Sequence, residues 1–123
     1  MTPTQRSLAK LRDDNWTVAI VEKWNQWAKV RQDLYGFADL LAVSPSRGII
    51  AVQTTSGNNV AARVDKIRQE PRAGIWLAAG GKIVVHGWRK VGPRGKRKVW
   101  ECREVEIQAE GNDELTVSRN KSA

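Results

Sequence analysis

The chain begins with apolar residues at helical spacing and then changes to the spacing of a strand. Leu8 and Leu11 fall on one face of a predicted helix. Residues 2–5, Thr-Pro-Thr-Gln, place a capping box at its start, with the proline in the first helical position. Apolar residues of one parity between residues 16 and 24 then predict a strand.

Two short apolar runs separated by a turn predict a pair of neighbouring strands. A mixed, polar connection over residues 25–36 leads to the first run, residues 40–43. The turn Ser-Pro-Ser-Arg-Gly at residues 44–48 separates this run from the second one, residues 49–54. The second run is uniformly apolar at its start, which is typical of a central, buried strand.

The second half of the chain returns to helical spacing before it ends in strands. An asparagine cap introduces a predicted helix over residues 60–67, and a proline follows its end. Residues 75–79 predict a short helix that two glycines close. Residues 82–88 and 98–107 alternate as strands do, and the glycine-rich basic stretch between them predicts a hairpin loop.

These elements predict a single domain of the α/β class. Their order is an αβββαβ core with an added C-terminal β-hairpin, and the central sheet should be mixed. The domain spans residues 1–108, which is enough chain to bury one core of modest size. Residues 109–123 are polar and rich in small side chains, so we expect a flexible tail there.

The charge of the chain points to an anionic partner. The formal net charge is +8 and the isoelectric point is near 10.2. Six cations, with no acid among them, are concentrated between residues 89 and 98. This clustering favours nucleic acid as the partner over a charge that only keeps the protein soluble.

Composition also limits the chemistry and the compartment. Cys102 is the only cysteine, so an internal disulfide is impossible and a reducing, cytoplasmic compartment is expected. His86 is the only histidine, so neither a zinc cluster nor a histidine-based triad is expected. No stretch resembles a membrane span or a signal region, so we expect no membrane partner.

The candidate chemistry lies at the ends of the two central apolar runs. Asp39 opens the first run, and Gln53-Thr54-Thr55 closes the second. If the two strands pair through the intervening turn, these residues lie at the same end of the pair. Asp39 would offer Mg²⁺ a carboxylate, Gln53 an amide oxygen and Thr54 a backbone carbonyl. The alternative is that Asp39 satisfies a turn and Gln53 pairs with the backbone.

These segments also carry a resemblance to a known family. Residues 36–42 (Gly-Phe-Ala-Asp-Leu-Leu-Ala), residues 49–55 (Ile-Ile-Ala-Val-Gln-Thr-Thr) and the basic helix after them resemble the PD-(D/E)XK nuclease superfamily. The chain is most similar to its small stand-alone members, the archaeal Holliday junction resolvases and the VRR-NUC nucleases common in phages. The likeness extends over the order of elements from residue 3 to residue 90.

The resemblance implies a restriction-endonuclease-like fold and cleavage of DNA that depends on Mg²⁺ or Mn²⁺. Ala38-Asp39 stands at the family's Pro-Asp dipeptide, Gln53 at its second acid and Thr55 at its lysine. The resemblance therefore assigns Asp39, Gln53 and Thr55 to catalysis. In the family the second acid binds the metal, while the lysine orients the attacking water and stabilises developing charge.

The missing acid and lysine direct attention to neighbouring side chains that could replace them. Glu22 shares the parity of the first predicted strand, and Asp33 lies shortly before Asp39, so either could supply a second carboxylate. The expected metal ligands are therefore Asp39, Gln53, Thr54 and Glu22. Four cations could replace the lysine: Lys23, Arg31, Arg63 and Lys66.

Two groups of cations are candidates for phosphate binding. Arg63 and Lys66 are three residues apart and share a helix face directly after the site, unless that face is only solvated. The loop between the last two strands is basic and made pliable by glycine and proline, so it could follow a DNA backbone without reading its sequence. Its cations are Arg89, Lys90, Arg94, Lys96, Arg97 and Lys98. Trp88 and Trp100 flank the loop and are more easily explained as core residues than as platforms for bases.

The combined expectation is a metal-dependent DNA endonuclease that could act on branched DNA. Its partner would be DNA, bound mainly through phosphates, and cutting a junction would require a homodimer. The resemblance places it in the cytoplasm of a bacterium or of a phage-infected host cell. The alternative is a catalytically inactive nuclease-fold protein that binds DNA, which the Gln53 and Thr55 replacements favour. A basic RNA-binding or ribosome-associated protein is a weaker third reading.

Overall fold

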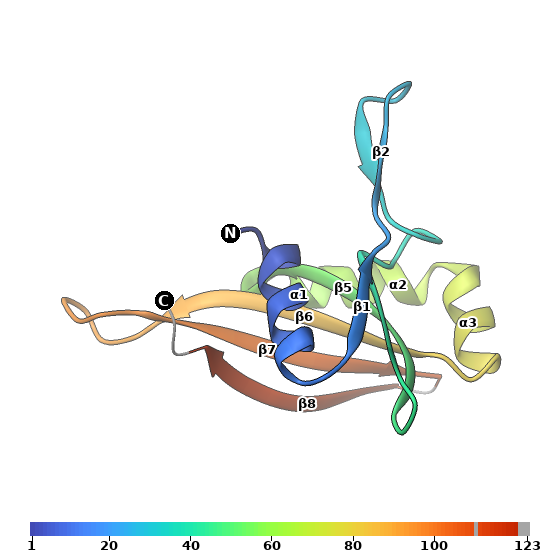
Figure 1. The fold of residues 1–123 in the computed structure, drawn as a ribbon. Coiled ribbons are helices and arrows are strands. Elements are labelled where there is room, and N and C mark those ends of the chain that lie inside the picture. Colours follow the sequence, from blue (N-terminus) through green and yellow to red (C-terminus); the bar gives the residue numbers. More distant parts are fainter. Residues whose placement is uncertain (110, 121–123) are drawn as a thin grey trace.

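A six-stranded mixed sheet forms the centre of the molecule (Figure 1). The computed structural model describes residues 1–109, and the backbone alone of residues 111–120. The strand order is β1-β4-β5-β6-β7-β8, in which β5 and β6 are parallel and the other neighbours are antiparallel. The strands are β1 Thr17–Ile20, β4 Leu40–Ser44, β5 Gly48–Ser56, β6 Lys82–Val91, β7 Val99–Gln108 and β8 Gly111–Asn120. The prediction of an α/β domain with a mixed sheet is confirmed.

Helices cover both faces of this sheet, because the inward residues of β5 alternate between two cores. Ile50 and Val52 pack with Leu11 of α1 (Pro3–Asp13) on one face. Ala51 points to the other face, where it packs with Val64 of α2 (Val60–Arg68). The helix α3 (Pro71–Ala78) lies on the same side as α2, and a short 3-10 turn, η1 (Gly57–Asn59), joins β5 to α2. The result is a three-layered α/β/α arrangement whose central strand presents polar residues only at its end.

The first helix begins as the sequence predicts. The Thr2 hydroxyl accepts a hydrogen bond from the Gln5 N–H at 3.2 Å, and the Gln5 side chain accepts one from the Thr2 N–H at 3.0 Å. Pro3 occupies the first helical position, where its missing N–H costs nothing. The capping box is therefore confirmed.

The segment after β1 differs from its prediction. Residues 16–24 do not form one strand, because β1 ends at Ile20 and the chain then leaves the central sheet. It returns through a separate two-stranded hairpin, β2 (Lys23–Asn25) and β3 (Val30–Gln32), which stands away from the body of the molecule (Figure 1). The polar connection expected over residues 25–36 is thus partly strand. Its hydrophobic pattern gave no sign of this, because the hairpin has no core to face.

Two further boundaries are corrected. The helix expected to begin at Ile75 begins at Pro71, where Glu70 caps it by accepting a hydrogen bond from the Arg72 N–H at 3.0 Å. The flexible tail expected from residue 109 is instead a strand over residues 111–120, paired with β7. Backbone pairing does not require an apolar side-chain pattern, so composition alone could not show it. Residues 110 and 121–123 of the expected tail lie outside the described residues.

Among the described residues, none of the helices has the length and apolar character needed to cross a membrane.

Candidate metal site and nucleic-acid cleft

Asp39 and Gln53 meet at one end of the β4–β5 pair, as the parity argument predicts. Leu40 pairs with Val52, and the Asp39 N–H donates to the Val52 carbonyl at 2.9 Å, so Asp39 lies beside Gln53. The Gln53 amide Nε2 donates to Asp39 Oδ2 at 2.7 Å. Asp39 is only 4% exposed. The predicted convergence of the two residues is therefore confirmed.

Thr54 completes the hydrogen bonding of Asp39. Its backbone N–H donates to Asp39 Oδ2 at 2.7 Å, and its hydroxyl lies 3.1 Å from the same oxygen. The Thr54 hydroxyl also contacts the Thr4 hydroxyl at 2.8 Å, which ties α1 to this end of β5. Asp39 therefore joins two strands rather than capping a turn. The groups of Thr54 that reach Asp39 are donors, whereas the sequence analysis expected its carbonyl to act as a metal ligand.

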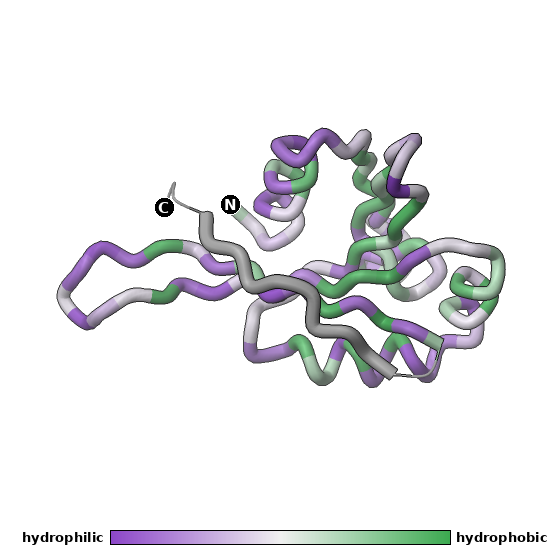
Figure 2. Tube along the Cα trace, turned by 90° about the horizontal axis from the view of Figure 1, so that it is seen from below, coloured by the Kyte–Doolittle hydropathy of each residue, from purple (hydrophilic) through white to green (hydrophobic). Residues whose placement is uncertain are grey.

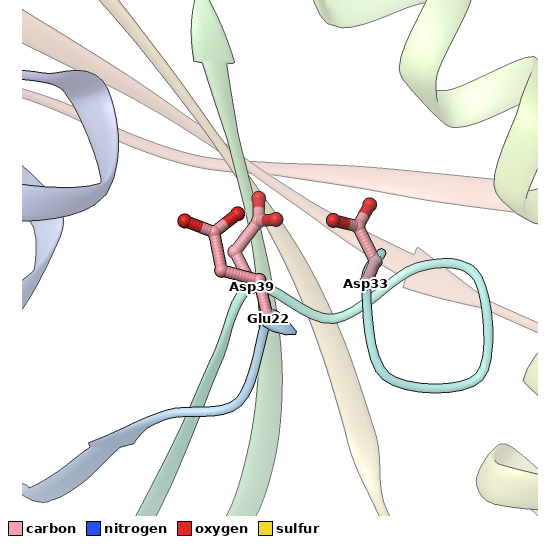
Figure 3. A group of neighbouring side chains, drawn as sticks. All are labelled: Glu22, Asp33 and Asp39. Carbon is pink, nitrogen blue, oxygen red and sulfur yellow. The ribbon is translucent and has the colours of Figure 1, made fainter. Parts of the chain in front are cut away.

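Three carboxylates converge at this point (Figure 3). Glu22, Asp33 and Asp39 each bring one oxygen to within 4.8 Å of the others. Glu22 follows β1, Asp33 follows β3 and Asp39 precedes β4, so the three acids come from separate segments that connect strands. The Asp39 carbonyl fixes the approach of the first segment by accepting from the N–H groups of Val21 and Glu22, at 2.9 and 3.3 Å. This group of acids, found among the described residues, could hold a metal ion.

The acid cluster is electrostatically unfavourable without a cation. The pKa of Asp39 is raised from its usual 3.8 to about 8, chiefly because burial disfavours the charged form. The hydrogen bond to Asp33 and the charges of Asp33 and Glu22 raise the pKa further, and the Thr54 N–H opposes them. Near neutral pH the cluster therefore retains a proton, which a bound divalent cation would displace.

Gln53 supplies a second sign that the site is built for a ligand. The residue is 1% exposed, and its Nε2 donates to Asp39 and also to Asp33, the latter at 3.3 Å. Its carbonyl oxygen Oε1 is buried and has no hydrogen-bond partner among the described residues. A buried polar atom without a partner is costly, and such atoms are uncommon in native structures. An all-oxygen donor set of three carboxylates and one such amide suits a hard cation such as Mg²⁺ or Mn²⁺. In the observed orientation, however, Gln53 faces the acids as a donor.

The cluster forms the floor of an open cleft of about 780 Å³. Of the cations that the sequence analysis named as replacements for the lysine, Arg31, Arg63 and Lys66 line this cleft, whereas Lys23 does not. Thr55 also lines it, and Thr55 is 6% exposed. The Arg31 guanidinium lies 3.4 Å from Glu22. The cleft thus places positive charge around an acidic floor, which is the arrangement that a phosphate bridged to a metal ion requires.

Arg72 is a cleft residue that the sequence analysis did not name. Its guanidinium contacts the Glu70 carboxylate at 2.6 Å, and this hydrogen bond lowers the pKa of Glu70 to about 2. Arg72 was not expected in the cleft, because the helix that carries it was predicted to begin at residue 75 and begins at Pro71. Thr4, at the start of α1, also lines the cleft.

The basic loop lies beyond the same end of the parallel strands β5 and β6 as the cleft. β6 runs parallel to β5, pairs with it as far as Trp88 and then continues to Val91. Residues 92–98 follow, are all exposed and form the hydrophilic end of a projecting hairpin (Figure 2). The exposed cations of this end are Arg94, Lys96, Arg97 and Lys98.

Two cations at the base of the loop already have partners. The Arg89 guanidinium donates twice to Glu101, at 3.1 and 3.0 Å. The Lys90 ammonium lies 5.4 Å from the ring centre of Trp100. Trp88 is 2% exposed and belongs to the core, as the sequence analysis expected. These residues stabilise the base of the hairpin, so the loop tip holds the cations that are free to meet a phosphate.

Comparisons with protein-family models, with curated proteins and with solved structures gave no match.

Proposed function

We propose that the protein is a Mg²⁺- or Mn²⁺-dependent DNA endonuclease with a restriction-endonuclease-like core. The observation that carries the proposal is the convergence of Glu22, Asp33 and Asp39 on the floor of a cleft with cationic walls. A divalent ion bound there would polarise a phosphodiester and lower the pKa of a bound water. The order of elements, α1, three antiparallel strands, α2 and a parallel β6, supports the same family.

The residues of the cleft have distinct roles in this proposal. The three carboxylates would hold the ion, and Arg63 and Lys66, which line the same cleft, would bind phosphates of the DNA. Hydrolysis forms a bond from the water oxygen to phosphorus and breaks the bond from phosphorus to the leaving sugar oxygen. The water gives up one proton and the leaving oxygen takes one up. Thr55 lies where the family has its lysine, and its hydroxyl orients the water but is too weak a base to deprotonate it.

A cleavage assay tests the proposal most directly. Wild-type protein and Asp39→Asn are incubated with duplex, single-stranded and four-way DNA in Mg²⁺, Mn²⁺ or chelator. We expect wild type to cut at least one substrate only with a divalent ion, and Asp39→Asn to cut none. Asp13→Asn is a matched control, because Asp13 is an exposed carboxylate at the end of α1. Equal cleavage by wild type and Asp39→Asn would show that the site is assigned wrongly.

The alternative function is a nuclease-fold protein that binds DNA without cutting it. The observation that favours it is the donor role of the Gln53 amide together with a threonine at residue 55, which leaves the floor of the cleft without an amine. DNA affinity that is the same with chelator and with Mg²⁺, and absence of cleavage under all conditions, would establish this alternative.

The basic loop provides an independent test of DNA as the partner. Replacing Arg94, Lys96, Arg97 and Lys98 together by Gln removes four exposed cations. Each phosphate contact contributes about 0.9 to the slope of log affinity against log salt concentration, so the slope should fall by roughly 3 to 4 if all four cations bind phosphate. An unchanged slope would exclude the loop from the DNA interface. A stronger preference for RNA than for DNA at matched salt would instead indicate an RNA-binding protein.

A further inference from the structure

The β2–β3 hairpin exposes two tryptophans that belong to neither hydrophobic cluster of the described residues. Trp27 is 87% exposed and Trp24 is 58% exposed, and the neighbouring Val30 is 47% exposed. The hairpin stands clear of the central sheet and forms a sheet of its own (Figure 1). Tryptophan is the side chain with most to gain from burial, and exposed groups of this kind mark interaction sites.

The tip of the hairpin is held in a defined conformation. The Asn25 side-chain oxygen accepts from the N–H groups of Trp27 and Ala28, both at 3.0 Å, and its amide donates to Gln32 at 3.2 Å. Lys29 closes the turn with a φ of 57°, a left-handed conformation that a lysine seldom adopts. Trp27 is therefore presented on a fixed turn, so less conformational entropy is lost when it binds a partner.

The charge of the hairpin identifies the kind of partner. Residues 23–32 contain Lys23, Lys29 and Arg31 and no acid. Two copies of the hairpin would bring like charges together, which opposes pairing with a second molecule of this chain. Aromatic faces set among cations suit single-stranded nucleic acid, since bases stack on the rings and phosphates meet the cations. A base paired within a duplex keeps both faces stacked, so only unpaired bases can use these rings.

The acid cluster lies at the base of the β2–β3 hairpin. Glu22 immediately precedes β2 and Asp33 immediately follows β3. Trp24 pairs with Arg31 across the hairpin, so these side chains share one face, and Arg31 continues this face to Glu22 at 3.4 Å. At roughly 3.3 Å per residue, the tip lies about 15 Å from the cluster. A strand stacked on the tip would therefore lead directly into the cleft.

We propose that the β2–β3 hairpin binds unpaired DNA bases by stacking on Trp27 and Trp24, so that the substrate is DNA with a single-stranded segment beside the scissile phosphate. The binding step requires no catalysis, and only the position of the cut rests on the proposed nuclease function.

The experiment measures binding in chelator, so that it is independent of cleavage. Fluorescently labelled single-stranded, blunt duplex and forked DNA are titrated with wild-type protein, Trp27→Ala, Trp27→Phe and Trp27→Leu. We expect Trp27→Ala to weaken single-stranded and forked binding by roughly 5- to 150-fold and to leave duplex binding within about twofold. Trp27→Phe should retain most of the affinity, whereas Trp27→Leu should behave as Trp27→Ala. Ile75→Ala is the control, because Ile75 is a 68% exposed apolar residue on α3.

The possible outcomes separate this inference from the proposed function. A loss of single-strand affinity in the expected pattern supports the hairpin even if no metal ion promotes cleavage. Equal affinity of all variants for every substrate would overturn it, as would a loss that is the same for duplex and single strands. If sedimentation shows a wild-type dimer that Trp27→Ala dissociates, the tip is a self-association site and the inference is wrong.

Discussion

Two groups of buried polar residues, on the neighbouring strands β5 and β6, differ in how completely their polar atoms find hydrogen-bond partners. On β6, His86 is 1% exposed, and both of its ring nitrogens have partners, the Ser7 hydroxyl at 2.9 Å and the Glu104 carboxylate at 3.0 Å. The Trp88 indole N–H donates to the same Ser7 hydroxyl at 2.8 Å. On β5, the buried amide of Gln53 has an oxygen that finds no partner within the described part of the chain, and Asp39 faces two further acids.

This difference in hydrogen bonding indicates that the group around His86 is structural. The chain of Ser7, His86 and Glu104 has the residue types of a hydrolase triad, but Ser7 is 0% exposed and its hydroxyl already accepts from Trp88. A network whose members are all satisfied holds α1 onto the sheet and needs nothing from outside. The Asp39 cluster instead keeps like charges together and leaves an acceptor unpaired, a cost that proteins sustain mainly at functional sites.

The strongest test of this contrast is Asp39→Asn, in which both the cleavage activity and the free energy of unfolding are measured. We expect metal-dependent cleavage to fall at least about 100-fold, because loss of even an outer-shell partner of a metal ligand costs 10- to 100-fold. The free energy of unfolding without metal should stay the same or rise, because repulsion with Asp33 and Glu22 is removed. Single-turnover cleavage and urea denaturation measure the two effects. A loss of more than about 2 kcal/mol of stability would place Asp39 with the structural network.

Ser7→Ala should show the reverse behaviour. The change leaves the Trp88 N–H and the His86 Nδ1 without partners in a buried site, so we expect a loss of about 2–4 kcal/mol in the free energy of unfolding. Cleavage at a temperature well below the melting transition should remain within about twofold of wild type. Ser46→Ala is the control, because Ser46 is exposed in the β4–β5 turn. A variant that is fully stable but inactive would make the His86 network part of the active site.

The pH dependence of stability should distinguish the cluster from the network. The pKa of Asp39 is about 8 in the folded protein and its ordinary value is 3.8, so between these values the folded state holds a proton that the unfolded state has lost. Stability is therefore greatest at the acidic end of this window and falls as pH rises through it. From pH 5 to pH 7 the loss should approach roughly 3 kcal/mol at 1.36 kcal/mol per unit.

Urea denaturation of the metal-free protein at several pH values measures this loss. Saturating Mg²⁺ should remove most of it, because the cation replaces the proton, and Asp39→Asn should flatten the same window. A wild-type stability that rises with pH across this window would show that the acids are separated in solution.

Replacing Gln53 by Glu introduces a further carboxylate beside Asp39 and Asp33. A fourth carboxylate should destabilise the metal-free protein further and strengthen divalent-ion binding by roughly tenfold. Calorimetric titration with Mn²⁺ measures the affinity. Gln32→Glu is a matched control, because Gln32 also lines the cleft but is exposed and bonded to Asn25. If both variants gain equally, the effect comes from the general charge of the cleft rather than from a ligand at residue 53.

Sequence reasoning recovers the parts of the molecule that strand periodicity controls. The predicted turn at 44–48 and the parity of the flanking runs placed Asp39 and Gln53 at the same end of the strand pair if the two runs paired, and the structure has that pairing. The alternation of β5 between two cores also follows from its uniform apolar start. The local sequence pattern therefore predicted the part of the site that Asp39 and Gln53 form.

The other half depends on contacts that no local pattern encodes. Glu22 and Asp33 meet only because the β2–β3 hairpin leaves and re-enters at the same point, and a hairpin without a core has no hydrophobic signature. Both acids were named from the sequence as alternatives, but nothing in their spacing showed that they lie together beside Asp39. The strand over residues 111–120 was missed for a related reason, since its pairing with β7 rests on backbone hydrogen bonds.

The smallest expected effect lies at the rim of the His86 network. The Lys10 ammonium is 3.7 Å from Glu104, with 25% and 16% of the two side chains exposed. An ion pair at this distance and exposure contributes little, so Lys10→Met should change the free energy of unfolding by less than about 1 kcal/mol. Lys82→Met is a matched control, since Lys82 and Lys10 both line one small pocket beside His86 and Glu104. A loss above 2 kcal/mol from Lys10→Met alone would mean that Glu104 needs a cation to remain charged beside His86. The network would then resemble the acid cluster, and the distinction between satisfied and unsatisfied sites would no longer separate structure from function.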